Sequence, residues 1–208
     1  TMTSFDDIIW TGTYTPNPGV EDATNKLNLN TNWTDTAGNT GSSATTVNFK
    51  IDTLEPTIVT DNHGNPVSMS DTALKIGDTA TVTIIFSEAV AGFASNDDVT
   101  VPNGTLPPMT SLDDITWTGV YIADNNVEDA TNELILGTNW TDTAGNTGSS
   151  GTTANFTIDT QAPTVSSFIM SDTALKIGET ATVTIVFSEV VAGFASNDDV
   201  TVPNGTLP

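Results

Sequence analysis

Cysteine and arginine are absent from the 208-residue sequence, and only four lysines and one histidine accompany its 26 aspartates and glutamates. Without cysteine the chain has no disulfide, no thiol nucleophile and no cysteine-ligated zinc. Nucleic acids and anionic membranes are bound by clustered lysine and arginine, so a net charge of −22 argues against both partners. Acid–base and oxyanion-stabilising side chains are equally scarce, and we predict no enzyme.

Long hydrophobic runs are also missing. No stretch approaches the roughly 18 apolar residues of a membrane-spanning helix, so we expect no membrane contact by this segment. What the sequence has in excess is carboxylate. Unbalanced negative charge repels itself in a compact fold unless cations bind, and cations are therefore the first ligands to consider.

The sequence repeats itself. Met2–Ile58 returns as Met109–Val165 with 40 of 57 positions identical, and Met69–Pro107 returns as Met170–Pro208 with 36 of 39 identical. Short proline-containing stretches after two apolar runs, at 51–57 and 158–164, have the composition of linkers. We therefore predict the second half of one repeat at 1–54, a complete repeat at 55–160 and the first half of a third at 161–208.

Apolar residues alternate with threonine and serine through the complete repeat, which indicates β-strands and almost no helix. Residues predicted to face inward include Trp117, Trp140, Ala154 and, in the first segment, Ile8, Trp10, Tyr14, Leu27, Leu29 and Trp33. About seven strands are expected, at 56–73, 79–88, 97–102, 104–111, 114–123, 132–142 and 151–159. An all-β fold of tandem immunoglobulin-like sandwiches follows from this count and spacing.

Four motifs recur in the same order, ALKIGDTATVTIIFSEAV, VEDATN, NWTDTAGNTG and IDTxxPT. With them the chain resembles the bacterial Ig-like repeats of giant calcium-dependent, type-I-secreted (RTX) adhesins, such as biofilm-associated proteins and the extender of an ice-binding adhesin. The resemblance implies an extracellular stalk on a bacterial cell surface, stiffened by Ca²⁺ at its domain junctions. Other domains would then bind the adhesive target.

The order of the loops in such a sandwich brings acidic residues from two consecutive domains to each linker. The exit end of one domain has Glu21, Asp22 and Asp52, and the entry end of the next has Glu88 and acidic loop residues. Calcium takes six to eight oxygen ligands, which such loops supply. The predicted ligands are Asp52, Glu21, Asp22, Asp97, Asp98, Asp142 and Asp35, with the repeat equivalents Asp159, Glu128, Asp129, Asp198 and Asp199.

Plainer interpretations stay open for these residues. Aspartates in turns also accept backbone hydrogen bonds, and Asp35 and Asp142 in the DTAGN stretch would fix a turn without any metal. The function could instead be that of a ligand-binding or homotypic adhesion module, which would need an exposed apolar or aromatic patch.

The two ends of the chain are complementary in sequence. Joining Pro208 to Thr1 of another copy rebuilds the stretch NGTLP-PMTSLDD of the complete repeat with two changed residues. We expect residues 161–208 to complete residues 1–54 of a neighbour head to tail. The join would be either a continuing polypeptide or a contact between separate chains.

Overall fold

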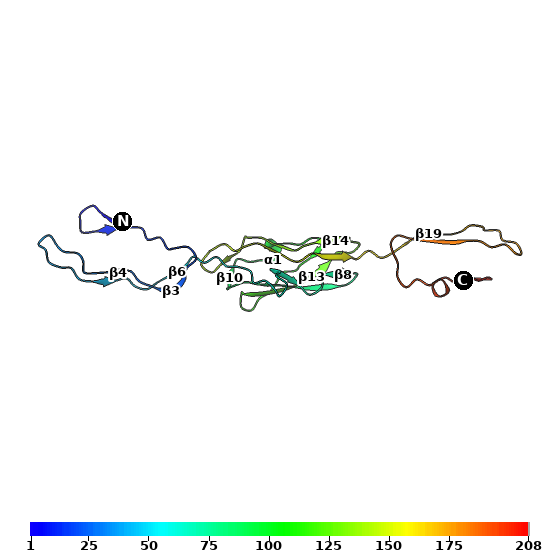
Figure 1. The fold of residues 1–208 in the computed structure, drawn as a ribbon, viewed down its shortest axis with the longest axis horizontal. Coiled ribbons are helices and arrows are strands. Elements are labelled where there is room, and N and C mark those ends of the chain that lie inside the picture. The colour runs from blue at the N-terminus through cyan, green and yellow to red at the C-terminus, as the bar shows by residue number, and fades with distance from the viewer. Residues whose placement is uncertain (208) are drawn as a thin grey trace.

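The computed structural model describes residues 1–207 and is elongated (Figure 1). For description we divide it into a central domain (55–160) and two terminal segments at opposite ends, which we call the head segment (1–54) and the tail segment (161–207). Within residues 1–207 no helix is long and apolar enough to cross a membrane.

The central domain is a sandwich of two β-layers. One layer is a four-stranded antiparallel sheet in the order β12-β13-β9-β7. Its members are β7 (Val67–Met69), β9 (Thr79–Ile85), β12 (Gly104–Thr105) and β13 (Thr116–Ala123). The longest ladder, between β9 and β13, pairs Thr79 through Ile85 with seven consecutive residues of β13.

The other layer is built from shorter pieces, in the orders β14-β18-β8 and β11-β15-β17. Its members are β8 (Ala73–Lys75), β11 (Val99–Thr100), β14 (Glu128–Asn132), β15 (Ile135–Leu136), β17 (Gly151–Thr152) and β18 (Phe156–Asp159). The first predicted strand contributes β7 to one layer and β8, parallel to β18, to the other. This is the strand order of an immunoglobulin-like sandwich, so the predicted fold class is confirmed.

The alternation in the sequence places one apolar face of each layer in a shared core. Val82 and Ile84 on β9, Tyr121 on β13 and Leu136 on β15 are all fully buried. Trp140 lies at the centre, where its ring is 4.4 Å from that of Phe86 and its indole N–H donates to the Gly137 carbonyl at 3.0 Å. These burials confirm the predicted inward parity of the central strands.

Trp117 also faces the core, but it is less buried than Trp140. Its ring meets Phe93 edge-on at 4.9 Å and is only partly buried. The indole N–H is shielded from solvent and has no hydrogen-bond partner among the described residues. A donor buried without an acceptor costs free energy, so Trp117 contributes less to stability than its ring area suggests.

Several predicted strands are interrupted. The predicted strand 97–102 begins instead with the helical turn α1 (Ser95–Asp98), because the Asp98 carboxylate accepts the Ala94 N–H at 2.7 Å and closes the turn. The predicted strand 132–142 is divided into β15 and β16 (Thr141–Asp142). In β14, just before it, the register shifts between Asp129 and Asn132, and the buried Asn132 amide donates to the Asp129 and Phe156 carbonyls. Ala154, expected inside, is exposed because the last strand breaks before Phe156.

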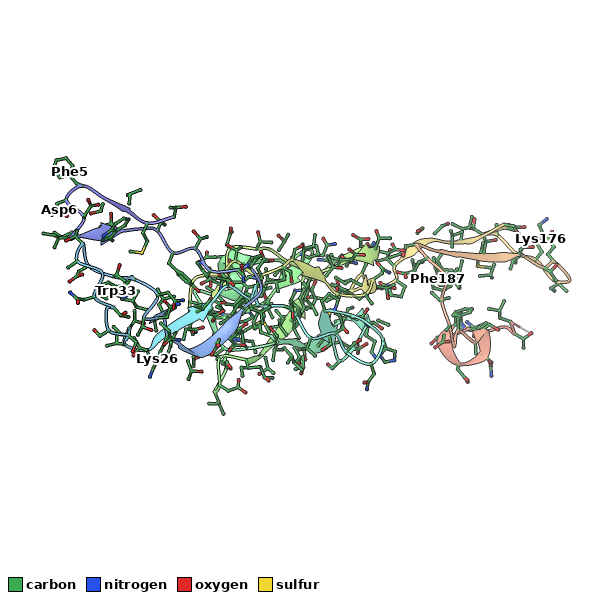
Figure 2. The ribbon with its side chains drawn as sticks, turned by 60° about the vertical axis from the view of Figure 1, so that its left-hand side comes forward. Phe5, Asp6, Lys26, Trp33, Lys176 and Phe187 are labelled. Carbon is green, nitrogen blue, oxygen red and sulfur yellow. The ribbon has the colours of Figure 1, made fainter. Side chains whose placement is uncertain are left out.

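The terminal segments contain only two-stranded pairings. In the head segment β1 (Thr3–Ser4) pairs with β2 (Trp10–Thr11), β3 (Glu21–Asn25) with β6 (Phe49–Asp52), and β4 (Asn28–Leu29) with β5 (Ala44–Thr45). In the tail segment β19 (Val165–Met170) pairs with β20 (Val183–Phe187), and the short helix α2 (Ser196–Asp199) follows. Figure 2 shows the side chains of both segments spread along thin ribbons on either side of the dense central domain.

The head-segment residues predicted to face a core are exposed in this chain. All six side chains are exposed to solvent, namely Ile8, Trp10, Tyr14, Leu27, Leu29 and Trp33. The expectation of burial is wrong for them here, and the reason is physical. Each head pairing is two-stranded, and the exposure of these side chains shows that no second sheet formed by residues 1–207 covers them.

Candidate metal centre

Three carboxylates meet where the head segment joins the central domain. Asp52 ends β6, Glu88 follows β9, and Asp142 lies on β16 (Thr141–Asp142), which pairs with β10 (Val90–Ala91). One carboxylate oxygen of each lies within 4.8 Å of the others. Two oxygens that ligate one Ca²⁺ at about 2.3–2.6 Å lie at most about 5 Å apart. The spacing therefore suits a single shared cation.

Asp142 is fixed by the turn that it begins. One of its carboxylate oxygens accepts the backbone N–H groups of Ala144, Gly145 and Asn146 at 2.8, 2.7 and 2.9 Å. Gly145 has a φ of 98°, a conformation that side-chain-bearing residues rarely adopt. Burial opposes ionisation, but the hydrogen bonds outweigh it, so the pKa of Asp142 is lowered. A buried and ionised carboxylate is the result.

Asn146 links this turn to the preceding segment. Its side-chain amide donates to the second Asp142 oxygen at 2.7 Å, and to the carbonyl and carboxylate oxygens of Asp52 at 3.3 Å each. One amide therefore contacts both sides of the junction and orients two of the three carboxylates. Asp52 itself is positioned by β6, where it pairs with Glu21 of β3.

The carboxylates of the cluster repel one another when no cation lies between them. Burial raises the pKa of Glu88, and the negative charges of Asp142, Asp52 and Glu21 raise it further. Among residues 1–207 the ion pairs are His63–Asp61, Lys75–Asp78 and Lys176–Glu179, and none of them involves this cluster. No side-chain cation of the described chain therefore neutralises the three carboxylates.

The donor set fits a hard cation. Carboxylate and carbonyl oxygens are the ligands of calcium, whereas zinc and copper favour nitrogen and sulfur. Asp52, Glu88 and Asp142 would hold the ion, with the Asp52 carbonyl and water available as further ligands. The ion would supply positive charge between two domains that otherwise present negative charge to each other.

The structure brings together two of the predicted ligands, Asp52 and Asp142, and places Glu21 beside them. Glu88, which sequence reasoning places at this end without including it among the ligands, is the third member. One feature of the sequence pointed to Glu88. The motif FSE ends the second predicted strand of the repeat and occurs twice, finishing in Glu88 and in Glu189.

The other predicted ligands lie elsewhere, and their metal roles stay predictions. Asp22 and Asp129 accept hydrogen bonds from Thr24 and Thr131 in their own strands. Asp97 and Asp98 are in α1, and Asp198 and Asp199 are in α2. Glu128 pairs with Asp159 on β18 at the second junction, as Glu21 pairs with Asp52 at the first.

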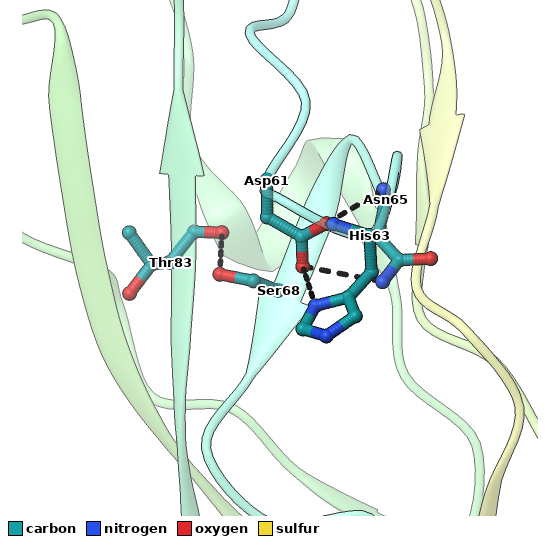
Figure 3. Close-up of polar contacts among 5 residues, drawn as sticks. All are labelled: Asp61, His63, Asn65, Ser68 and Thr83. Atoms are coloured by element: carbon teal, nitrogen blue, oxygen red, sulfur yellow. Dashed lines mark hydrogen bonds and ion pairs between the residues drawn. The ribbon is translucent and has the colours of Figure 1, made fainter.

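A D-x-x-G-N turn alone does not produce the cluster. Asp35 accepts hydrogen bonds from Ala37 and Asn39 in such a turn, and Asp61 accepts them from His63 and Asn65 in another (Figure 3). The one ion-pair partner of Asp61 among residues 1–207 is His63, with 3.9 Å between the carboxylate and the imidazole. Asp142 differs from these two aspartates because Asp52 and Glu88, from two other parts of the chain, lie beside it.

Replacing Glu88 with glutamine should stabilise the metal-free protein at neutral pH. The raised pKa means that ionised Glu88 destabilises the fold above that pKa, and that this cost disappears as the pH falls through it toward the ordinary value of 4.5. The advantage of Glu88→Gln in melting temperature, measured in EDTA, should therefore shrink on acidification. At lower pH both proteins lose the opposite contribution of Asp142, whose pKa is lowered from 3.8. An advantage independent of pH would contradict the repulsion.

Comparison with known proteins gives one kind of match. A family model described as a bacterial Ig-like domain matches residues 1–51, 52–158 and 159–208. Curated proteins give no match, and neither do solved structures.

Proposed function

The chain belongs to the family of bacterial Ig-like domains, and from this premise we propose that it is a structural extender in the stalk of a bacterial cell-surface adhesin, with calcium at the domain junctions. Members of this family are typical of surface proteins and are typically non-enzymatic. We accordingly assign the chain an extracellular location and no catalytic role. Its partners in the stalk are neighbouring repeats, and other domains bind the adhesive target.

One observation favours the calcium-dependent junction over a plain linker. Carboxylates from two consecutive domains, Asp52 on one side and Glu88 and Asp142 on the other, lie within 4.8 Å of one another. Carboxylates with no cation between them would be expected to lie farther apart, since like charges repel most at short range. Here Asn146 and the Asp142 turn hold the carboxylates together.

Calcium at this position would convert repulsion between domains into shared coordination. Asp142 needs no rearrangement because its turn already fixes it, and β6 presents Asp52 from the other domain. The ion would also stabilise the native state by mass action, because the unfolded chain does not assemble the three carboxylates. A chain with these properties would be flexible where calcium is scarce and stiff outside the cell.

A calorimetric titration of the metal-free 208-residue chain with CaCl₂ tests this proposal. We expect Glu88→Gln and Asp52→Asn each to weaken binding at the first junction at least tenfold. Glu133→Gln, which removes an exposed charge outside the cluster, should bind as the wild type does. At a calcium concentration of about 100 Kd, binding should add about 2.7 kcal/mol to the free energy of unfolding.

Two results would refute the proposal. One is the absence of both binding heat and any shift of the melting transition between calcium and EDTA. The other is equal calcium binding by the wild type, Glu88→Gln and Asp52→Asn, because binding would then occur away from this cluster.

A further inference from the structure

The two layers of the central domain have different outer faces. Along β9 and β13 the residues that alternate with the buried ones face solvent, and the strand register aligns them in rows across the four-stranded sheet. The rows contain hydroxyl and branched aliphatic side chains and no charged one, namely Val59, Ile85 and Thr116; Ser68, Thr83, Thr118 and Thr110; Ser70, Thr81 and Val120; and Thr79, Ile122 and Thr105. We call these residues the neutral face.

The outer face of the other layer is charged. Lys75, Glu128 and Asp159 lie in one register row across β8, β14 and β18, and all three are exposed. Next to the neutral face, Asp78 lies directly before β9 and Asp124 directly after β13, outside the strands themselves. One outer face of the sandwich therefore lacks charge in a chain whose net charge is −22.

The other copies of the repeat keep these positions uncharged although the side chains differ. In the head segment the equivalents of the β13 positions 116, 118, 120 and 122 are Ile9, Thr11, Thr13 and Thr15. In the tail segment the equivalents of positions 68, 79, 81, 83 and 85 are Ile169, Thr180, Thr182, Thr184 and Val186. Threonine and serine are exchanged with isoleucine and valine, and no exchange introduces a charge. The repeated property is neutrality rather than a particular residue.

We propose that the neutral face docks a second copy of the chain, face to face, so that two chains lie side by side. The occupant follows from charge. Two copies that each carry −22 repel each other, and like charges opposite one another across a contact cost several kcal/mol. A neutral face that meets its own counterpart avoids this juxtaposition, whereas the outer face of the other layer does not.

The composition of the neutral face suits packing of one sheet on another. Val120, Ile122 and Ile85 are 47%, 44% and 39% exposed, so apolar surface is available to be removed from water. Packed sheets lie about 10 Å apart and interdigitate their side chains. Threonine hydroxyls donate and accept hydrogen bonds, so they can pair across the contact. At the β7 edge the Ser68 hydroxyl already donates to the Thr83 carbonyl at 3.3 Å (Figure 3).

The symmetry of such a contact fixes its stoichiometry. Because both copies use the same face, the contact is isologous and closes at two copies. The central domain has one complete sheet of this kind, so the 208-residue chain should dimerise through it. In the proposed stalk each repeat would add one neutral face, and several weak contacts along two chains would strengthen their association through effective concentration.

Sedimentation velocity of matched variants tests the proposal. Ile122→Asp places a charge on the neutral face, and Ile135→Asp places the same charge on the outer face of the other layer. The two isoleucines are 44% and 43% exposed. Thr118→Asp on β13 and Thr157→Asp on β18 form a second pair at exposed positions. All proteins are measured in EDTA up to about 1 mM, the Kd of a weak contact, and near-ultraviolet circular dichroism confirms folding.

We expect the wild type, Ile135→Asp and Thr157→Asp to show a reversible monomer–dimer equilibrium. Ile122→Asp and Thr118→Asp should dimerise at least about tenfold more weakly, because two like charges would face each other in the dimer. Dimerisation should strengthen as NaCl is raised, since a Debye length of about 30 Å at 0.01 M falls to about 3 Å at 1 M and repulsion between the copies is screened.

Three results would overturn the proposal. The first is a wild type that stays monomeric, including one whose neutral face binds soluble dextran instead, with binding lost in Ile122→Asp. The second is equal association of both members of a pair, because the contact would then lie on another surface of the chain. The third is association that salt weakens, because charge pairs would then hold the copies together. All measurements are made without calcium, so none of these results bears on the proposed calcium site.

Discussion

Replacing Trp140 with alanine should lower the free energy of unfolding of the central domain by about 3–5 kcal/mol, as truncation of a buried aromatic ring does. Trp140 is fully buried, packs on Phe86 and donates to the Gly137 carbonyl. A Cβ at Gly148 would come within 2.2 Å of the ring, so the backbone on that side is also fitted to the indole. Urea denaturation followed by circular dichroism measures the change.

The chain contains its own control for this substitution. Trp33 lies in the same stretch, TNWTDTAGNTGSS, but is 45% exposed. Trp33→Ala should leave the unfolding of the central domain unchanged within about 0.5 kcal/mol. If Trp140→Ala cost less than about 1 kcal/mol, or as little as Trp33→Ala, the packing described for the core would be wrong.

Asp142→Ala should destabilise the central domain by about 3 kcal/mol or more even without calcium. Hydrogen bonds to charged groups contribute about 1.5–3 kcal/mol each, and the buried Asp142 carboxylate accepts several of them. Asp142 accepts from three backbone N–H groups and from the Asn146 amide. The measurement is urea denaturation in EDTA, so that the loss of a metal ligand does not enter the result.

Glu88→Gln is the matched control, because it changes a neighbouring carboxylate that the turn does not need. In EDTA the two substitutions should act in opposite directions, with Asp142→Ala destabilising and Glu88→Gln stabilising. In calcium both should weaken binding. Equal stability of Asp142→Ala and the wild type in EDTA would show that the turn does not depend on this carboxylate.

The layers of the fold were predictable because they depend on local alternation. Val82, Ile84 and Phe86 alternate with threonine and serine, and all three are buried. The interruptions were not predictable, because they depend on polar side chains that reach distant backbone. Asn132, for example, bonds to the carbonyl of Phe156, which lies 24 residues further along the chain.

Burial of individual tryptophans shows the same limit. The sequence predicts equal burial for Trp117 and Trp140, and a loss of about 3–5 kcal/mol for Trp117→Ala. The structure leaves Trp117 partly buried with an unpaired indole N–H, so its truncation should cost less than that of Trp140. Periodicity assigns a face of the strand, but not the partner of a polar atom on that face.

The candidate site was predictable in place and incomplete in membership. Loop order brought Asp52 and Asp142 to one junction although 90 residues separate them, and the structure places them together. Glu88 completes the group because it lies between β9 and β10, and β10 pairs with β16, which bears Asp142. The aspartates of α1, by contrast, are acidic residues of the kind predicted to bind calcium, but the Asp98 carboxylate accepts a backbone hydrogen bond that closes a helical turn.

Distance measurements across the first junction test the central claim most directly. Because the chain has no cysteine, two spin labels can be attached specifically through Lys50→Cys on β6 and Val120→Cys on β13, both at exposed positions. Pulsed electron–electron double resonance then measures the distribution of distances between the two spin labels. We predict that calcium narrows this distribution relative to EDTA, and that Glu88→Gln abolishes the narrowing. Identical distributions in calcium and EDTA would contradict a calcium-stiffened extender.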